Sequence, residues 1–332
     1  MLLYLQITLF GAVLLYAGKT LFIPLFMGLL IAIILYPICI WLEHKKWSKS
    51  LAITACILLV AVLFGALLAL MLWQINVFSQ DAPALFKKVG DELSALQQWA
   101  EAKAGIVINM QNLSAKFFDN FGSALSSTLQ TTANTLFILF LTPVFTALFL
   151  YHRHIFVRYL KMIIPAGYEP DLDAILKETI HTYFNYIKGM VLVYIIVGLL
   201  NSAGLYFLGV DHYLLFGMLC AIMTIVPYVG IIVSAMLPIS VVWLQTGNLL
   251  YPLGVILLFS VVQYLEANVI FPKVVGEQLQ VSTMAMLVAI IAGGIIWGVS
   301  GMILFIPFVA ILKIISDHIT EWKPLNTLLR RD

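Results

Sequence analysis

Three polar residues, Gln263, Glu266 and Asn268, lie near the end of an apolar run that is long enough to cross a membrane. Burying a carboxylate or a carboxamide there costs several kcal/mol unless the group is paired or meets water. Pro272 lacks a backbone N–H and disfavours helical angles at Phe271, so we predict that the helix breaks within a turn of Glu266 and leaves backbone carbonyls free. Because such backbone lines wet cavities in membrane proteins, these residues are a candidate substrate or ion site.

A second interruption lies inside the apolar run at 213–247. Pro227 breaks a helix and Gly230 permits backbone angles that other residues resist, so this run predicts two short helices joined by a turn. The side chain of Tyr228 is suited to hydrogen-bond a solute or to anchor at the membrane interface, and both roles stay open. The run at 281–298 is short as well. Two short or interrupted segments in a transporter-sized chain indicate a site at the membrane midplane.

The same residues also allow purely structural interpretations. Glu266 could simply terminate a helix at the lipid headgroups. Asn268 lies about 200° around a regular helix from Glu266, so the two side chains meet only if the helix unwinds. The glycines of the last apolar stretch favour close helix packing over direct ligand contact, and they would let helices slide past one another; they are Gly293, Gly294, Gly298 and Gly301, followed by Pro307.

Composition places the chain in a membrane. Of its 332 residues, 62% are hydrophobic and 10% charged, against about 45–50% apolar residues in soluble domains. The net charge of +2 and the scattered basic residues exclude nucleic acid as a partner. No H-E-x-x-H or nucleotide-binding P-loop occurs, and the three cysteines lie in apolar runs, so the sequence predicts neither an enzyme nor a metal or cofactor site. Transport would then draw its energy from a gradient.

The predicted fold is an all-α, polytopic bundle of transmembrane helices. About eight spans, some interrupted or re-entrant, follow from apolar runs of roughly 20 residues; these runs lie at about 2–18, 21–42, 51–75, 131–151, 185–209, 213–247, 249–271, 281–298 and 301–316. The first two runs form a tight hairpin or one bent unit. Residues 76–130 carry apolar side chains at helical spacing and predict two amphipathic helices, covered by the transmembrane body or a sister subunit rather than lying on lipid.

Five segments and an orientation follow from this pattern. Short loops rich in Lys and Arg, among them Lys45, Lys46 and Lys49, face the cytoplasm by the positive-inside rule, as do both termini. The segments are a hairpin with the third span at 1–75, the outer amphipathic helices at 76–130, the fourth span with a connector helix at 131–184, an interrupted transport core at 185–316, and a cytoplasmic tail at 317–332.

Three motifs in combination resemble a known family. They are Pro227-Tyr-Val-Gly230, Glu266-x-Asn268-x-Ile-x-Pro272-x-x-x-Gly276, and Gly293-Gly294-x-x-x-Gly298-x-x-Gly301 followed by Pro307. Together they resemble the autoinducer-2 exporter family of bacterial membrane proteins, also called PerM-like permeases, over nearly the whole chain. Where the family would carry a second proline after the glycine of the first motif, this sequence has isoleucine, which predicts a looser turn.

The resemblance implies a transporter of the bacterial inner membrane. Its solute would be a small organic molecule such as the quorum-sensing signal autoinducer-2, and sodium(lithium)/proton antiport is the alternative, with Glu266 as the proton or cation carrier. The resemblance also implies a homo-oligomer, of which a pentamer is one option. A different class stays open as well, namely a non-transporting membrane scaffold that binds a partner through its outer helices.

Overall fold

The structure is a computed structural model that describes residues 10–11, 13–66, 69, 73, 132–164, 168–224, 229–248, 250–276 and 278–331. The described residues are almost entirely helical, and their one isolated β-bridge pairs Val281 with Arg330. The all-α prediction is therefore confirmed. The amphipathic helices predicted at 76–130, and most of the first apolar run at 2–18, lie outside the described residues.

Within the described residues, five helices are long and apolar enough to cross a membrane: Lys19–His44 (α2), Lys49–Ala66, Asp171–Phe207, Leu250–Val274 and Val299–His318. Helix α5 (Thr132–Tyr151) and helix α6 (Arg153–Ile163) pass the same test only together and are bent by 69°. Three shorter apolar helices, Tyr213–Met223, Ser234–Trp243 and Thr283–Trp297, add to these. The count predicted from apolar runs thus combines full-length spans with short segments, and the polytopic helical bundle is confirmed.

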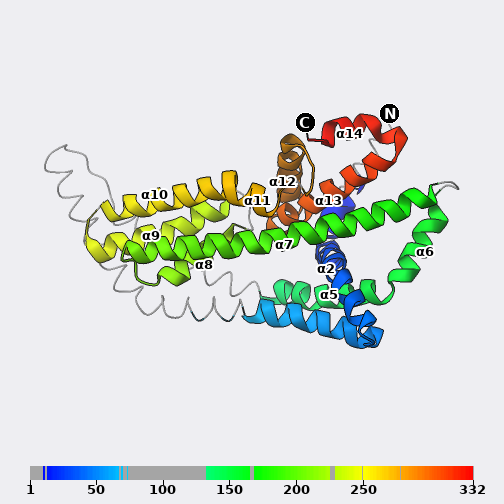
Figure 1. The fold of residues 1–332 in the computed structure, drawn as a ribbon, viewed down its shortest axis with the longest axis horizontal. Helices are drawn as coiled ribbons and strands as arrows, with labels where there is room; N and C mark the ends of the chain where they lie inside the picture. Colours follow the sequence, from blue (N-terminus) through cyan, green and yellow to red (C-terminus); the bar gives the residue numbers. More distant parts are fainter. Residues whose placement is uncertain are drawn as a thin grey trace.

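Helix α7 (Glu169–Phe207) is the longest helix of the described chain and joins two groups of helices. Its C-terminal half packs against α8 (Tyr213–Met223), α9 (Val229–Thr246) and α10 (Leu250–Leu265), whereas its N-terminal half is crossed by α2 and α13 (Val299–His318) (Figure 1). The sequence explains the division, because α7 begins with a polar, acidic segment and becomes apolar after Gly189. A single rigid element therefore holds both groups.

Helices α8 and α9 match the two short helices predicted around Pro227. Helix α8 ends at Met223 and α9 begins at Val229, while Pro227 and Tyr228 themselves lie outside the described residues. Both helices pack into one buried cluster with the C-terminal half of α7 and with α10; its buried members are Leu205, Val210, Leu215, Phe216, Cys220, Val241, Val242, Val255 and Phe259.

Near the start of the described chain, α2 packs on α5 through a glycine. The position of a Cβ atom on Gly28 would lie 3.1 Å from the Thr142 carbonyl oxygen, so the two backbones approach closely. Thr146 is buried and its hydroxyl donates to the carbonyls of Thr142 (2.8 Å) and Gly28 (3.2 Å). Before α2, the Gly18 N–H donates to the Leu14 carbonyl and the Phe22 N–H donates to the Gly18 carbonyl, so the helical path continues through Gly18.

The last long helices form a tight hairpin. Helix α12 (Thr283–Trp297) is followed by the single residue Gly298, which has a φ of 62°, and then by α13. A Cβ atom on Gly293 would overlap the Gly301 backbone, and one on Gly301 would overlap that of Gly293. These glycines therefore bring two helix backbones into contact, which is the packing role that the sequence favoured for them.

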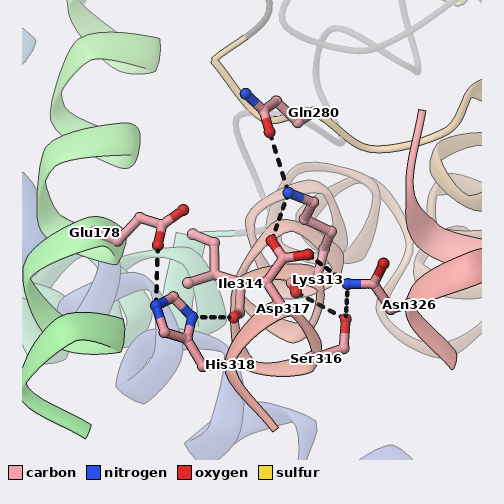
Figure 2. A network of polar contacts seen from close by, with 8 residues as sticks. All are labelled: Glu178, Gln280, Lys313, Ile314, Ser316, Asp317, His318 and Asn326. Carbon is pink, nitrogen blue, oxygen red and sulfur yellow. Dashed lines mark hydrogen bonds and ion pairs between the residues drawn. The ribbon is translucent and has the colours of Figure 1, made fainter. Parts of the chain in front are cut away.

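Buried Lys313 in α13 holds a polar network that ties the C-terminal segment to the hairpin. Its ammonium group lies 2.5 Å from Asp317 and donates to Gln280, at the entrance to α12, over 3.2 Å (Figure 2). Asn326 of α14 (Lys323–Leu329), which follows η2 (Thr320–Trp322), donates to both Ser316 and Asp317. We call Gln280, Lys313, Asp317 and Asn326 the C-terminal clamp.

Two further contacts extend from this network. The Ser282 N–H donates to the Leu329 carbonyl over 2.7 Å, which fixes α14 beside the start of α12. His318 lies 3.5 Å from Glu178 of α7, as Figure 2 also shows. The C-terminal segment thus contacts the hairpin directly, and it meets α7 through His318 at the end of α13 and through Glu321, which accepts a hydrogen bond from the Tyr168 hydroxyl before α7 over 2.9 Å.

The hairpin contact predicts a large cost for a single methyl group. Gly301→Ala should lower the free energy of unfolding by about 1–3 kcal/mol, because overpacking against backbone cannot be relieved by a rotamer change. Gly65→Ala is the matched control, since nothing lies within 4 Å of a Cβ atom there. Thermal denaturation of both purified variants in detergent measures the difference, and equal melting temperatures would contradict the packing role.

The clamp predicts a non-additive pair of substitutions. Asp317→Ala alone leaves the buried Lys313 ammonium without its carboxylate and should cost about 3 kcal/mol. Lys313→Met combined with Asp317→Ala should recover most of that loss, because no unpaired charge then remains buried. Denaturation of the single and double variants gives the coupling energy between the two side chains. Strictly additive effects would contradict a stabilising pairing of the two charges.

Candidate functional site

Glu266 is buried inside a membrane-length helix. Its side chain is 7% exposed, within the apolar segment Leu250–Val274. Its Oε2 atom is buried and accepts no hydrogen bond from any described residue. A buried carboxylate oxygen without a donor costs free energy in proportion to its desolvation, so such a group is uncommon unless it has a role. Glu266 is therefore the central residue of the candidate site.

The helix around Glu266 widens instead of breaking. Helix α10 continues into a π-helical turn, η1 (Glu266–Ile270), and then into α11 (Phe271–Val274). The predicted break before Pro272 is wrong, because the Phe271 N–H donates to the Glu266 carbonyl five residues earlier. Pro272 lies in the first turn of α11, where its missing N–H is tolerated. The helix thus accommodates Pro272 through a π-turn, and such turns recur at functional sites.

The other polar residues of this segment do not gather around Glu266. Asn268 is exposed, and its Nδ2 atom donates to the Tyr264 carbonyl of its own helix over 2.9 Å. Gln263 is half-buried and Pro272 is exposed. Because the helix does not unwind, Asn268 stays on a different face from Glu266.

Side chains of α7 and α8 lie near the carboxylate instead. Glu266 interacts electrostatically with Tyr194 of α7 and with Cys220 of α8. Ser234 of α9 hydrogen-bonds with Cys220. Helix α8 leads into the Pro227 segment and α9 follows it, so Cys220 connects Glu266 with the helices that flank the second predicted interruption. Gly230 is described as a helical residue in the first turn of α9.

Two buried polar residues of α7 escaped the sequence analysis. Asn201 and Ser202 are 2% and 5% exposed, and neither the Asn201 Oδ1 atom nor the Ser202 Oγ atom has a hydrogen-bond partner among the described residues. A signal was available in the sequence, because this Asn-Ser pair interrupts an otherwise apolar stretch between 190 and 208. In a lipid-length segment, such a pair marks a candidate site by the same cost argument as Glu266.

Helix packing puts Asn201 on the same helix interface as Glu266. Gly204 of α7 lies against Leu258 of α10, and Gly189 of α7 lies against Val275, so the two helices run antiparallel. Val197 packs with Val262 in one buried cluster. Asn201 follows Val197 by one turn and Glu266 follows Val262 by one turn, so the two polar residues are separated by roughly one to two helical turns along the interface.

Small residues allow α7 and α8 to pack closely beside the polar side chains. A Cβ atom on Gly217 of α8 would collide with the backbone and hydroxyl of Ser202. Gly198 of α7 similarly faces Ala221 of α8, at 3.3 Å from a Cβ position. The α7, α8 and α10 backbones therefore pack closely around the polar residues, which limits access of lipid to them.

The hairpin glycines belong to a neighbouring part of the fold. Trp297 of α12 and Leu304 of α13 pack with Tyr183 of α7 in one cluster. Tyr186, three residues further along α7, contacts both this cluster and the one next to Glu266. Gly293, Gly294, Gly298, Gly301 and Pro307 thus shape the helices beside the candidate site and do not line it.

The chemistry available at the site is that of hydrogen-bond acceptors. The unpartnered atoms of Glu266 and Asn201 are oxygens, and the Ser202 hydroxyl can donate or accept. Such a set can hold a proton on the carboxylate, a small cation, or the hydroxyl groups of a polar solute. We call Glu266, Asn201, Ser202, Cys220 and Ser234 the buried polar cluster.

Comparison with known proteins places these features in a family. Residues 5–321 match the model of the AI-2E family transporter. The chain is 24% identical to YrrI of Bacillus subtilis (strain 168), covering 90% of this chain and 87% of YrrI. It is 24% identical to YhhT of Escherichia coli (strain K12), covering 95% and 89%. It is 23% identical to the AI-2 transport protein TqsA of the same organism, covering 92% and 88%.

The family match extends over the candidate site as well as over the membrane-length helices. Residues 5–321 include α2, α7, the π-turn at Glu266 and the hairpin of α12 and α13. Its breadth agrees with the resemblance drawn from the three motifs. The chain is a multi-pass membrane protein and belongs to the AI-2E family of transporters.

Proposed function

We propose that this protein is a gradient-driven exporter of a small polar organic solute and that the buried polar cluster is its binding site. The observation that carries the proposal is Glu266, a buried carboxylate with an unpartnered oxygen at a π-turn inside a membrane-length helix. A transporter pays for such a group only if a ligand or proton satisfies it during the cycle. Membership of a transporter family supports the same function.

The cluster suits a solute that carries hydroxyl groups. Glu266 and Asn201 supply acceptors, and Ser202 supplies a hydroxyl that can donate or accept. These side chains come from α7 and from η1 at the end of α10, while Cys220 and Ser234 come from α8 and α9. A site shared between four helices opens to either side of the membrane when those helices change their packing. The AI-2 signal is the candidate solute, supported by the name of the relative TqsA.

Location and orientation form part of the proposal. We place the protein in the bacterial inner membrane with both termini cytoplasmic. Lys49 donates to the Tyr151 carbonyl over 2.6 Å, and Arg153 bonds Glu43 over 2.6 Å. These contacts put the basic loop at 43–50 and the basic start of α6 at one end of the molecule, so their charges act together in the positive-inside rule. A homo-oligomer, with residues 76–130 packed on the body or on a sister subunit, completes the proposed assembly.

Cation/proton antiport is the second candidate, and the unpartnered Oε2 atom of Glu266 favours it. A carboxylate that binds either a proton or a cation, but not both, exchanges one for the other across the membrane. Asn201 Oδ1 and Ser202 Oγ would then be neutral oxygen ligands for a hard cation. Solute export needs no titrating group, so the two functions differ in what they require of Glu266.

Glu266→Gln tests the role of the charge. The variant keeps the size of the side chain and removes its ability to bind a proton or cation. In proteoliposomes with an imposed pH gradient, we expect solute or cation flux coupled to that gradient to fall to the level of protein-free vesicles. Expression and oligomeric state should not change.

Asn268→Ala is the matched control, because Asn268 lies in the same π-turn but is exposed. It should retain most of the coupled flux. A Glu266→Gln protein with normal, gradient-responsive transport would move the site to neutral residues. If purified wild-type protein moves neither AI-2 nor sodium or lithium ions under any gradient, the scaffold function becomes the better explanation.

Asn201→Leu separates function from stability. Because the Asn201 Oδ1 atom has no partner, an apolar side chain of similar size should leave the melting temperature unchanged or raise stability by up to about 1 kcal/mol. Transport should nevertheless fall. Leu199→Ile, on the exposed face of the same helix, is the control for α7 substitutions. A stable Asn201→Leu protein with full flux would remove Asn201 from the site.

A further inference from the structure

Helix α6 has an apolar face of which the described helices contact only Phe156, through the Phe149 ring of α5. None of its residues is buried. Ile155, Tyr159 and Met162 are 61%, 61% and 74% exposed, and Phe156 and Ile163 are exposed beside them. Large apolar side chains gathered on one face of a helix form a surface that needs a partner.

The face of α6 next to these apolar side chains is basic. His154, Arg158 and Lys161 lie within about 60° of one another on the helical wheel, and the helix contains no acidic residue. Lys161 pairs with Asp173 of α7 over 2.7 Å. Arg158 is exposed and makes no ion pair with any described residue. An apolar face beside a Lys/Arg face is the pattern of helices that lie in a membrane interface.

The position of α6 follows from its junction with α5. The two helices differ in direction by 69° at His152. Because α5 is part of a membrane span, a helix that leaves it at this angle runs largely along the membrane surface. In Figure 1, α6 accordingly turns away from α5 towards the start of α7. Arg153 holds the turn in place through its bond to Glu43.

The apolar face of α6 continues the outer surface of α5. Exposed apolar side chains lie along α5 at Phe140, Val144, Leu148 and Tyr151, and the first exposed apolar residue of α6, Ile155, follows Tyr151 by four residues across the bend. A surface that contacts lipid along α5 is therefore continuous with the apolar face of α6.

Aromatic and basic side chains surround this end of the molecule. Trp41 and Trp47 are exposed in and after α2, and the Lys45 ammonium lies 3.8 Å from the centre of the Trp41 ring. Tryptophan and lysine concentrate at the headgroup level of membranes. The Arg153–Glu43 contact places these residues next to the start of α6.

We propose that α6 is an amphipathic anchor that binds an anionic lipid surface, with Ile155, Tyr159 and Met162 in the acyl boundary and Arg158 at the headgroup phosphates. The partner is lipid and not a sister subunit, because the apolar face is continuous with the lipid-facing surface of α5 and is bordered by cationic side chains. The anchor holds the connection between α5 and α7 at the membrane surface. Helix α7 then moves relative to a point that is fixed at that surface.

Spin labelling of the full-length protein in vesicles tests the position of α6. Met162→Cys and Arg158→Cys each receive a nitroxide, in phosphatidylcholine vesicles with and without phosphatidylglycerol. Wild-type protein is the blank, because Cys39, Cys56 and Cys220 are buried. Val191→Cys, on the exposed apolar part of α7, calibrates the hydrocarbon interior.

The nitroxide at Met162 should lie about 5–10 Å below the phosphates, relaxed by oxygen and shielded from a water-soluble nickel chelate. The nitroxide at Arg158 should respond to the nickel chelate. Relaxation of both labels by nickel would place α6 in water. Protection of Met162 from both reagents would mean that protein covers the face. Either result overturns the proposal.

The preference of α6 for anionic lipid is measured separately. The readout is the ratio of motionally restricted spin-labelled phosphatidylglycerol to phosphatidylcholine. Arg158→Gln should lower that ratio by up to about fivefold, the effect of one basic residue at the surface. Lys177→Gln, an equal loss of charge on the exposed side of α7, should change it much less. Equal effects of the two variants would contradict a specific role for α6.

Discussion

The burial of charge in an apolar helix bundle is the constraint on which this structure depends. Two buried ionisable side chains meet it in different ways. Lys313 lies between Asp317 and Gln280, so its burial is compensated within the fold. Glu266 has an oxygen atom with no donor among the described residues. The first arrangement is that of a structural ion pair, and the second leaves a place for a proton, an ion or a solute.

Close backbone packing lets the fold carry these groups. Gly217 against Ser202 brings α8 onto α7, and Gly293 against Gly301 closes the hairpin of α12 and α13. Helices in lipid gain stability from such contacts, because no hydrophobic effect drives them together. The contact of Gly217 with Ser202 also limits access of lipid to the polar residues of α7. Small residues at the α7–α8 interface therefore serve both the packing and the candidate site.

Helix α7 connects the parts that a transport cycle must coordinate. It supplies Asn201 and Tyr194 near Glu266, it packs on the α12–α13 hairpin through Tyr183, and its acidic start contacts α6 through Asp173 and the tail through Glu178. A tilt of this one helix changes the polar cluster and the hairpin contact together. The lipid anchor proposed for α6 would supply the fixed point for that movement.

Much of this molecule was determined by the sequence alone. Apolar runs of membrane length predicted the helical bundle, because helices and closed barrels are the only regular structures that span a lipid bilayer. The glycines predicted the hairpin packing, and the cost of a carboxylate in an apolar run identified Glu266. Three motifs identified the family that the comparisons confirm. Each of these conclusions rests on the local chemistry of a residue and its immediate neighbours.

The tertiary structure decided which residues share the candidate site with Glu266. Asn268 was predicted beside it, but the π-turn preserves the helical path and leaves Asn268 exposed. Asn201 was overlooked, because its distance from Glu266 depends on the antiparallel packing of α7 and α10 over a loop and two intervening helices. Because proline lacks an N–H group, it predicts a break in the helix. A helix can instead accommodate the missing hydrogen bond by one wider turn when its neighbours hold it in place. Pairings between distant helices are set by how side chains fit across them, which local spacing does not encode.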